Sequence, residues 1–422
     1  MFDAIKEDWR VAAEFVVDHI AQPEELEQTV QSEPGGPSGV LWDQYSLGSG
    51  YAGTALALLE LGKLWDRDDL IEASFSHLRQ AVRTYNSRPG QLGLFVGATG
   101  ILVSLTECSM LEHRFRPSAL RLRSQVNDQL LSTDWSFARD TPLRPGEFDL
   151  ISGLSGILIA LTSSAISDDQ SQVAIDHVAH YLAWVFRTGG IPAFFQSPRS
   201  YAEGSANRVL HPNGLTDATL AHGLAGVLQA LAMTHLLTPT TLDLREPIRL
   251  LIDAIHLAGS PIESYVPGSG ALLKPQLSRS PVWCRGDTGV LIALSWGARA
   301  VGDDAVVTDS KARLEQATRH AGALNRHGTS LCHGLAGMVV ASLSAEDRDA
   351  HSVLTKSLVQ AFNPASAFGF TERSGTQTLN DPSLLSGAAG AALALGLAAS
   401  NSKRAPGWLS TLFQAPNEVD FD

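Results

Sequence analysis

Cysteine and histidine are the residues of this chain whose types and spacing first suggest chemistry. The segment VWCRGDTGVLIAL, residues 282–294, places Cys284 two residues before a glycine, and Cys332 and His333 fill the two positions before another glycine. Two thiolates and an imidazole suit Zn²⁺ and leave a fourth coordination position open for water or substrate. The alternative is that both cysteines are small buried apolar residues, as free cysteines usually are. Because the two cysteines share one position relative to a glycine, we favour a zinc site.

Three polar residues lie ahead of glycines of the same kind. His222 directly precedes one of them, Asp149 lies shortly before another, and Arg285 follows Cys284. His222 could instead be a capping or core histidine, Asp149 a helix N-cap, and Arg285 a solvated side chain. The shared location favours a role in the site for His222, and catalysis or support of a catalytic residue for Asp149. The remaining cysteine, Cys108, has no such context and is expected in the core.

These glycines belong to a repeat that must position the polar residues. A glycine, two residues, a second glycine and an apolar run occur seven times, at spacings of 47, 56, 70, 63, 48 and 53 residues. Repeats of this period indicate an array of similar structural units. The seven copies are GYAGTALALL at Gly50, GATGILVSL at Gly97, GLSGILIAL at Gly153, GLAGVLQAL at Gly223, GDTGVLIAL at Gly286, GLAGMVVASL at Gly334 and GAAGAALAL at Gly387.

Two kinds of helix are expected in each unit. The segments after the glycines are apolar and small, which predicts helices buried on all sides, whereas segments such as 68–85 and 169–186 have the periodicity of surface helices. The pattern predicts an all-α fold, an α/α toroid with a double ring of seven inner and seven outer helices. We expect a single domain over residues 1–422, with Gly/Pro-rich rim insertions around 187–215 and 258–282.

The net charge, the apolar stretches and the cysteine count exclude several classes of protein. The net charge of −13 and the absence of a basic stripe argue against nucleic acid as a partner. The sequence opens on an amphipathic helix, and its most apolar stretch, GAAGAALALGLAAS, is shorter than the ~20 residues of a membrane span. Three cysteines provide no disulfide framework. We therefore expect a cytoplasmic protein without a membrane span.

The chain resembles the lanthionine synthetase C-like family, which includes the cyclases of class I lanthipeptide biosynthesis. The resemblance covers nearly the whole chain and rests on the seven repeats and on the segments DLISGLSG, LAHGLAG, WCRG and CHGLAG, in the family's order. It implies one Zn²⁺ held by Cys284, Cys332 and His333, and acid–base roles for His222 and Asp149. Many of these cyclases have a tyrosine where this chain has Arg285, so the tyrosine's role is not transferable. A charged guanidinium there suggests electrostatic support instead.

The function implied by the resemblance is intramolecular Michael addition. A cysteine of a dehydrated lanthipeptide precursor adds to dehydroalanine or dehydrobutyrine and closes a thioether ring. The resemblance also implies a dehydratase and a transporter of the same pathway as partners, and such a biosynthetic complex could hold the protein at the membrane periphery. The alternatives are a glutathione-binding protein and an enzyme that adds glutathione to dehydroamino acids. A glycosidase or terpene cyclase on the same fold would require paired acids or an aspartate-rich motif, and neither is evident at the rim positions.

Overall fold

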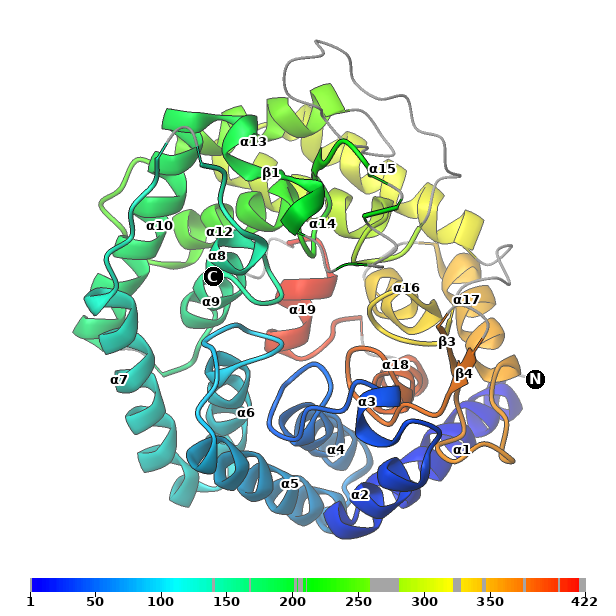
Figure 1. The fold of residues 1–422 in the computed structure, drawn as a ribbon. Helices are drawn as coiled ribbons and strands as arrows, with labels where there is room; N and C mark the ends of the chain where they lie inside the picture. The colour runs from blue at the N-terminus through cyan, green and yellow to red at the C-terminus, as the bar shows by residue number, and fades with distance from the viewer. Residues whose placement is uncertain are drawn as a thin grey trace. The chain divides into compact units, whose positions relative to one another are not determined.

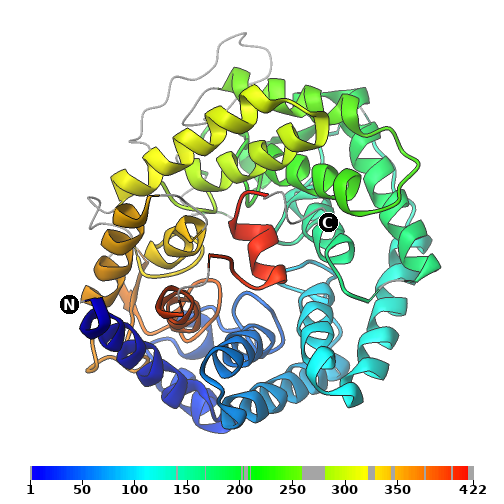
Figure 2. The same ribbon diagram turned by 180° about the vertical axis from the view of Figure 1, so that it is seen from behind.

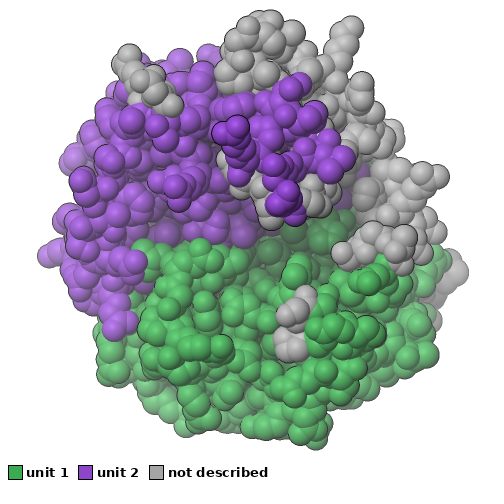
Figure 3. Space-filling view, in the orientation of Figure 1, with its two compact units in different colours: residues 1–122, 315–414 green, residues 123–314, 415–422 purple. Residues whose placement is uncertain are grey.

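The computed structural model describes residues 2–138, 141–166, 168–200, 203, 208–209, 211–258, 281–321, 328–343, 347–374, 377–400 and 403–416. The chain divides into two compact units (Figure 3). Unit 1 comprises residues 1–122 and 315–414, and unit 2 comprises residues 123–314 and 415–422. The prediction of a single domain over the whole chain stays a prediction.

Each of the seven repeats forms a helix that begins one residue after its first glycine. In each case that glycine is the N-cap, and nearly all residues of the helix are buried, as the apolar runs predict. The helices are α4 (Tyr51–Trp65), α6 (Ala98–Leu111), α9 (Leu154–Thr162), α12 (Leu224–Leu237), α14 (Asp287–Val301), α16 (Leu335–Ser342) and α18 (Ala388–Ala399).

A second set of helices packs against the first within each unit (Figures 1 and 2). In unit 1, α5 covers α4 and α6, α17 covers α16 and α18, and α1 lies along α18; in unit 2, α10 packs on α9 and α12, and α13 packs on α12 and α14. Each of α5, α10 and α17 buries one face and exposes the other. Within the units, the set consists of α1 (Phe2–Ile20), α5 (Asp68–Ser87), α10 (Asp169–Gly189), α13 (Arg245–Ala258) and α17 (Arg348–Gln360). Two further helices, α7 (Arg116–Ser132) and α15 (Asp304–Ala321), each contain a boundary between the two units.

The glycines are required because the loop before each buried helix folds back over the helix start. A Cβ on Gly97 would lie 2.1 Å from the Gln91 carbonyl oxygen, and one on Gly100 would lie 2.3 Å from the Leu94 oxygen. No side chain caps α6. Instead, the Ala98 N–H donates to the Gln91 carbonyl at 3.0 Å, so the loop itself satisfies a backbone donor that a helix start leaves free. The residues just before the glycine are thereby fixed at the N-terminal end of the helix.

Short elements complete the two units. Unit 1 contains α2 (Pro23–Ser32), α3 (Gly36–Gly39), η1 (His113–Phe115), α19 (Gly407–Phe413) and an antiparallel pair of strands, β3 (Glu372–Ser374) and β4 (Gln377–Leu379). Unit 2 contains α8 (Pro145–Phe148), η2 (Ile191–Phe194), η3 (Pro198–Ser200) and the antiparallel pair β1 (Phe195–Gln196) and β2 (Leu215–Thr216).

The two predicted insertions stay predictions. In the described part of 187–215, β1 pairs with β2, and α10 continues to Gly189 because its last turn is still part of the amphipathic pattern. Most of the second segment, 259–280, lies outside the described residues. Among the helices that the structure describes, none combines the length and the apolar character needed to cross a membrane.

Candidate metal centre and acid–base pair

Cys332 and His333 lie in the loop that precedes α16, in unit 1. The Cys332 N–H donates to the Leu385 carbonyl at 2.9 Å, and the Leu385 N–H donates in turn to the Gly48 carbonyl at 2.9 Å. Both Leu385 and Gly48 stand two residues before a repeat glycine, as Cys332 does. Backbone hydrogen bonds therefore join equivalent positions of successive repeats and hold the Cys332 loop in register. The His333 side chain is 44% exposed.

Cys284 lies in the loop that precedes α14, in unit 2. It is buried, and its carbonyl accepts a hydrogen bond of 3.0 Å from the N–H of Ala221, which also stands two residues before its repeat glycine. Trp283 beside it is fully buried and packs in the core. Cys284 thus has the same place in its repeat as Cys332 has in its own, which is the register that the sequence predicts.

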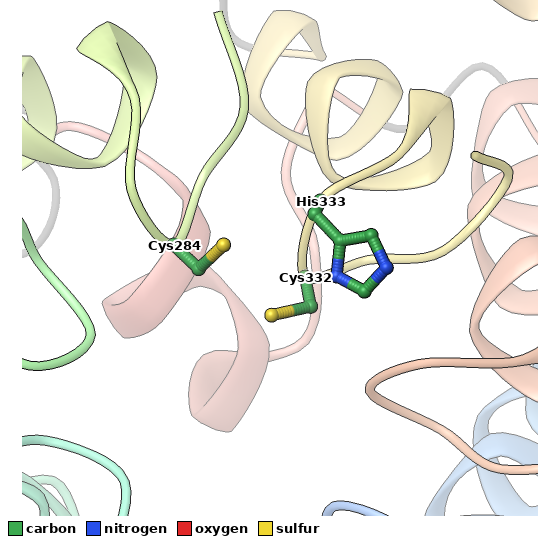
Figure 4. Close-up of side chains that lie close together, drawn as sticks. All are labelled: Cys284, Cys332 and His333. Atoms are coloured by element: carbon green, nitrogen blue, oxygen red, sulfur yellow. The ribbon is translucent and has the colours of Figure 1, made fainter. Parts of the chain in front are cut away.

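One ligand atom from each of Cys284, Cys332 and His333 lies within 4.8 Å of the others (Figure 4). Among the described residues, these form the only group of three or more Cys, His, Asp or Glu side chains with such spacing. Two thiolates and one imidazole are donor types that fit zinc, and three protein ligands leave one coordination position open.

His222 and Asp149 form a close pair in unit 2. The His222 Nδ1 lies 2.7 Å from Asp149 Oδ2, and Asp149 is 1% exposed. The other carboxylate oxygen, Oδ1, accepts from the N–H of Ser152 at 2.7 Å, from its hydroxyl at 3.0 Å and from the Gly153 N–H at 2.9 Å. Asp149 therefore does two things: it orders the turn that leads into α9, and it contacts the Nδ1 edge of the imidazole.

The electrostatic surroundings favour the protonated form of His222. Burial lowers the pKa of His222, but the hydrogen bond and negative charge of Asp149, together with the charge of Asp217, outweigh that effect and raise the pKa above its ordinary value. Arg285 opposes the shift through its positive charge. The Arg285 side chain is exposed. An imidazole tuned in this way can donate a proton near neutral pH.

A family model described as "Lanthionine synthetase C-like protein" matches residues 41–413. The chain belongs to this family. The match covers all seven repeats and every residue that the sequence singles out for the site, so the predicted family is confirmed.

Two known proteins are similar to this chain in sequence or in structure. It is 24% identical over 315 residues to "Nisin biosynthesis protein NisC" of Lactococcus lactis subsp. lactis, an alignment that covers 70% of this chain and 72% of that protein. The structure is similar to that of nisin cyclase, with a TM-score of 0.68, 19% identity, and coverage of 89% of this chain and 93% of the other. This likeness confirms the predicted all-α, α/α-toroid fold class.

One residue at the centre is absent from the sequence-based set. Glu372, in β3, places Oε2 3.5 Å from Nε2 of His333. It lies in the segment FGFTERSGTQTL, where no second ligand type or repeat glycine stands beside it. Its proximity to His333 depends on the β3–β4 hairpin, and no sequence signal reveals that contact.

Cys108 is buried, as predicted, and burial raises the pKa of its thiol to about 12.

Proposed function

We propose that this protein is a zinc-dependent lanthipeptide cyclase. Membership of the lanthionine synthetase C-like family supports the proposal, and the observation that carries it is the convergence of Cys284, Cys332 and His333 within 4.8 Å. These three residues would hold one Zn²⁺, which when bound lowers the pKa of a substrate thiol and supplies the thiolate at neutral pH. The likeness to proteins named for nisin biosynthesis and nisin cyclisation supports a lanthipeptide precursor as the substrate.

The proposed reaction is the addition of a peptide thiol across a dehydroamino acid. A bond forms between the cysteine sulfur and the β-carbon of dehydroalanine or dehydrobutyrine, the carbon–carbon double bond becomes single, and the α-carbon receives a proton. The thiol loses one proton and the α-carbon gains one, so the peptide keeps its mass. No oxidant, reductant or nucleotide is consumed.

His222 is the proposed proton donor to the α-carbon. Its Nδ1 is engaged by Asp149 at 2.7 Å, which leaves Nε2 to act on the substrate. Asp149 keeps the ring in one orientation and favours its charged form, which is the form that can donate. We assign the guanidinium of Arg285 electrostatic stabilisation of the enolate oxygen that develops during addition.

The precursor is expected to arrive already dehydrated, because the reaction starts from dehydroamino acids. A dehydratase must therefore act first, and a transporter acting on the finished peptide would follow. We propose both as pathway partners of this protein.

The decisive experiment uses a candidate precursor peptide that is rich in Ser, Thr and Cys, after its dehydration. Incubation with the zinc-loaded protein should leave the peptide mass unchanged but abolish its reaction with a thiol-alkylating reagent. Mass spectrometry before and after alkylation measures both. The Cys284→Ala, Cys332→Ala double variant is the control and should leave the thiols alkylatable. Thiols that remain alkylatable with the parental protein, or a mass increase by added glutathione, would exclude the proposed cyclase.

A further inference from the structure

Glu372 is a buried carboxylate whose two oxygens have different surroundings. It is 5% exposed and lies in β3, opposite Leu379 of β4. Its Oε1 accepts from the Thr329 N–H at 2.6 Å and from the Thr329 hydroxyl at 2.9 Å. Its Oε2 has no hydrogen-bond partner within the described part of the chain, although it lies 3.5 Å from His333 Nε2. A buried carboxylate oxygen in this position requires a donor.

The Thr329 contacts fix which way the carboxylate faces. A backbone N–H cannot rotate away or become an acceptor, so Oε1 stays on Thr329 and Oε2 stays toward His333. In a neutral imidazole, one ring nitrogen carries the hydrogen and the other carries the lone pair. A hydrogen on Nε2 would satisfy Oε2 and leave the lone pair on Nδ1. In Figure 4, one ring nitrogen of His333 faces the sulfurs and the other points away from them.

The surrounding loop leaves space for this arrangement. A Cβ on Gly328 would lie 1.9 Å from Glu372 Oε2 and 2.7 Å from its carboxyl carbon. Only glycine at position 328 therefore lets the carboxylate reach His333. The φ of Gly328 is not in the left-handed region, so the requirement is one of space and not of backbone conformation.

We propose that Glu372 is a positioning residue that holds His333 in the tautomer with hydrogen on Nε2, so that Nδ1 is the metal ligand. The inference rests on the proposed zinc site. Such partners orient a ligating imidazole and increase its donor strength, and their loss typically weakens metal affinity by about 10- to 100-fold. Glu372 itself touches neither metal nor substrate in this proposal.

The test variant is Glu372→Gln, which keeps the size of the side chain. The Thr329 N–H will hold the amide oxygen, so the amide NH₂ faces His333 and can only be satisfied by a lone pair on Nε2. That tautomer has hydrogen on Nδ1, where the metal must bind. We expect Zn²⁺ affinity, measured by chelator competition, to fall by about 10- to 100-fold. The ligand-field absorption of the Co²⁺-substituted variant should also change.

A second variant, Gly328→Ala, displaces Glu372 without altering His333. It should lower Zn²⁺ affinity and change the Co²⁺ absorption in the same way.

Glu60→Gln is the matched control. Glu60 is also a buried glutamate of unit 1, but it contacts Lys63 and not the metal centre. Its variant should bind Zn²⁺ with parental affinity. Equal Zn²⁺ affinity and an unchanged Co²⁺ spectrum in Glu372→Gln would overturn the proposal, as would an equal loss in Glu60→Gln, which would indicate general destabilisation.

A measurement on the parental protein removes any dependence on variant folding. Long-range ¹H–¹⁵N correlation spectra of the metal-free, ¹⁵N-histidine-labelled chain should show His333 with hydrogen on Nε2; hydrogen on Nδ1 would contradict the proposal. Failure of the parental protein to bind Zn²⁺ at all would instead refute the proposed zinc enzyme, so the two failures are distinguishable.

Discussion

Two histidines of this molecule each lie beside a buried carboxylate that approaches one of the two ring nitrogens. Asp149 contacts the Nδ1 of His222 at 2.7 Å, whereas Glu372 lies 3.5 Å from the Nε2 of His333. In the roles proposed above, His222 would present Nε2 for proton donation, and His333 would present Nδ1 for metal binding.

The pH dependence of ring closure should depend on the His222–Asp149 pair. The raised pKa means that folding favours the imidazolium: the stability gained is fully present below the ordinary value of ~6.5 and disappears as pH rises through the raised value. In Asp149→Asn the burial remains while the opposing charge is lost, so the pKa of His222 should fall. The alkaline limb of the rate profile should shift to lower pH. An alkaline limb that stays in place would separate His222 from the proton transfer.

The role of His222 can also be tested at a single pH by replacing the side chain. His222→Asn should retain zinc and slow cyclisation by roughly two to four orders of magnitude, because a positioned acid or base contributes about that much. Metal content and alkylation-based rates measure the two effects. Loss of zinc in this variant would mean that His222 belongs to the metal centre.

The role proposed for Arg285 can be tested by comparing variants that remove its positive charge with variants that keep it. If its guanidinium stabilises the enolate oxygen, Arg285→Met should lose about a hundredfold or more in rate, as when a donor to an oxyanion is removed. Arg285→Lys should recover part of the rate, and zinc content should be parental in both. A parental rate in Arg285→Met would make Arg285 a surface residue without a catalytic role.

At the scale of elements, the repeat glycines control how the buried helices begin. A Cβ on Gly100 would lie 2.3 Å from the Leu94 carbonyl oxygen and 2.5 Å from the Leu47 Cβ, so both its own loop and a neighbouring one occupy the space. Gly100→Ala should lower the free energy of unfolding by ~1–3 kcal/mol through overpacking. Gly407 is the matched control, because a Cβ there would meet no atom within 4 Å, and Gly407→Ala should be neutral. Denaturant unfolding measures both.

The repeats also explain which elements the sequence predicts well. A glycine followed by an apolar run specifies the start of a buried helix locally, so all seven such helices follow from the sequence. The strands β3 and β4 have three residues each, too few to produce a recognisable alternation. Glu372 reaches Thr329 across 43 residues of sequence. The cluster of cysteines and His333 was predictable because it uses the repeat register, whereas Glu372 lies outside that register.

At the scale of the whole molecule, the helix α1 packs against α18, which lies near the other end of the sequence. The buried face of α1 includes Val16 and Val17 and packs against α18, although the family match begins at residue 41. The Val16→Ala, Val17→Ala variant should lose about 3–5 kcal/mol of unfolding free energy, from lost burial and the cavity left behind. Val11→Ala, at a position 55% exposed in the same helix, should change little. Equal stability of the two variants would mean that α1 is not part of the cooperative core.

Unit 1 is built from two stretches that lie far apart in the sequence, and this affects the order in which the protein can fold during synthesis. Residues 123–314 of unit 2, which include Asp149, His222 and Cys284, form one continuous stretch that emerges from the ribosome together. Unit 1 joins residues 1–122 to residues 315–414, so its early part must wait until residues 315–414 have been translated. Pairing across such a separation is slow. We therefore expect the loop that carries Cys332 and His333 to reach its final form only after synthesis, so that metal enters a completed protein and not a nascent one.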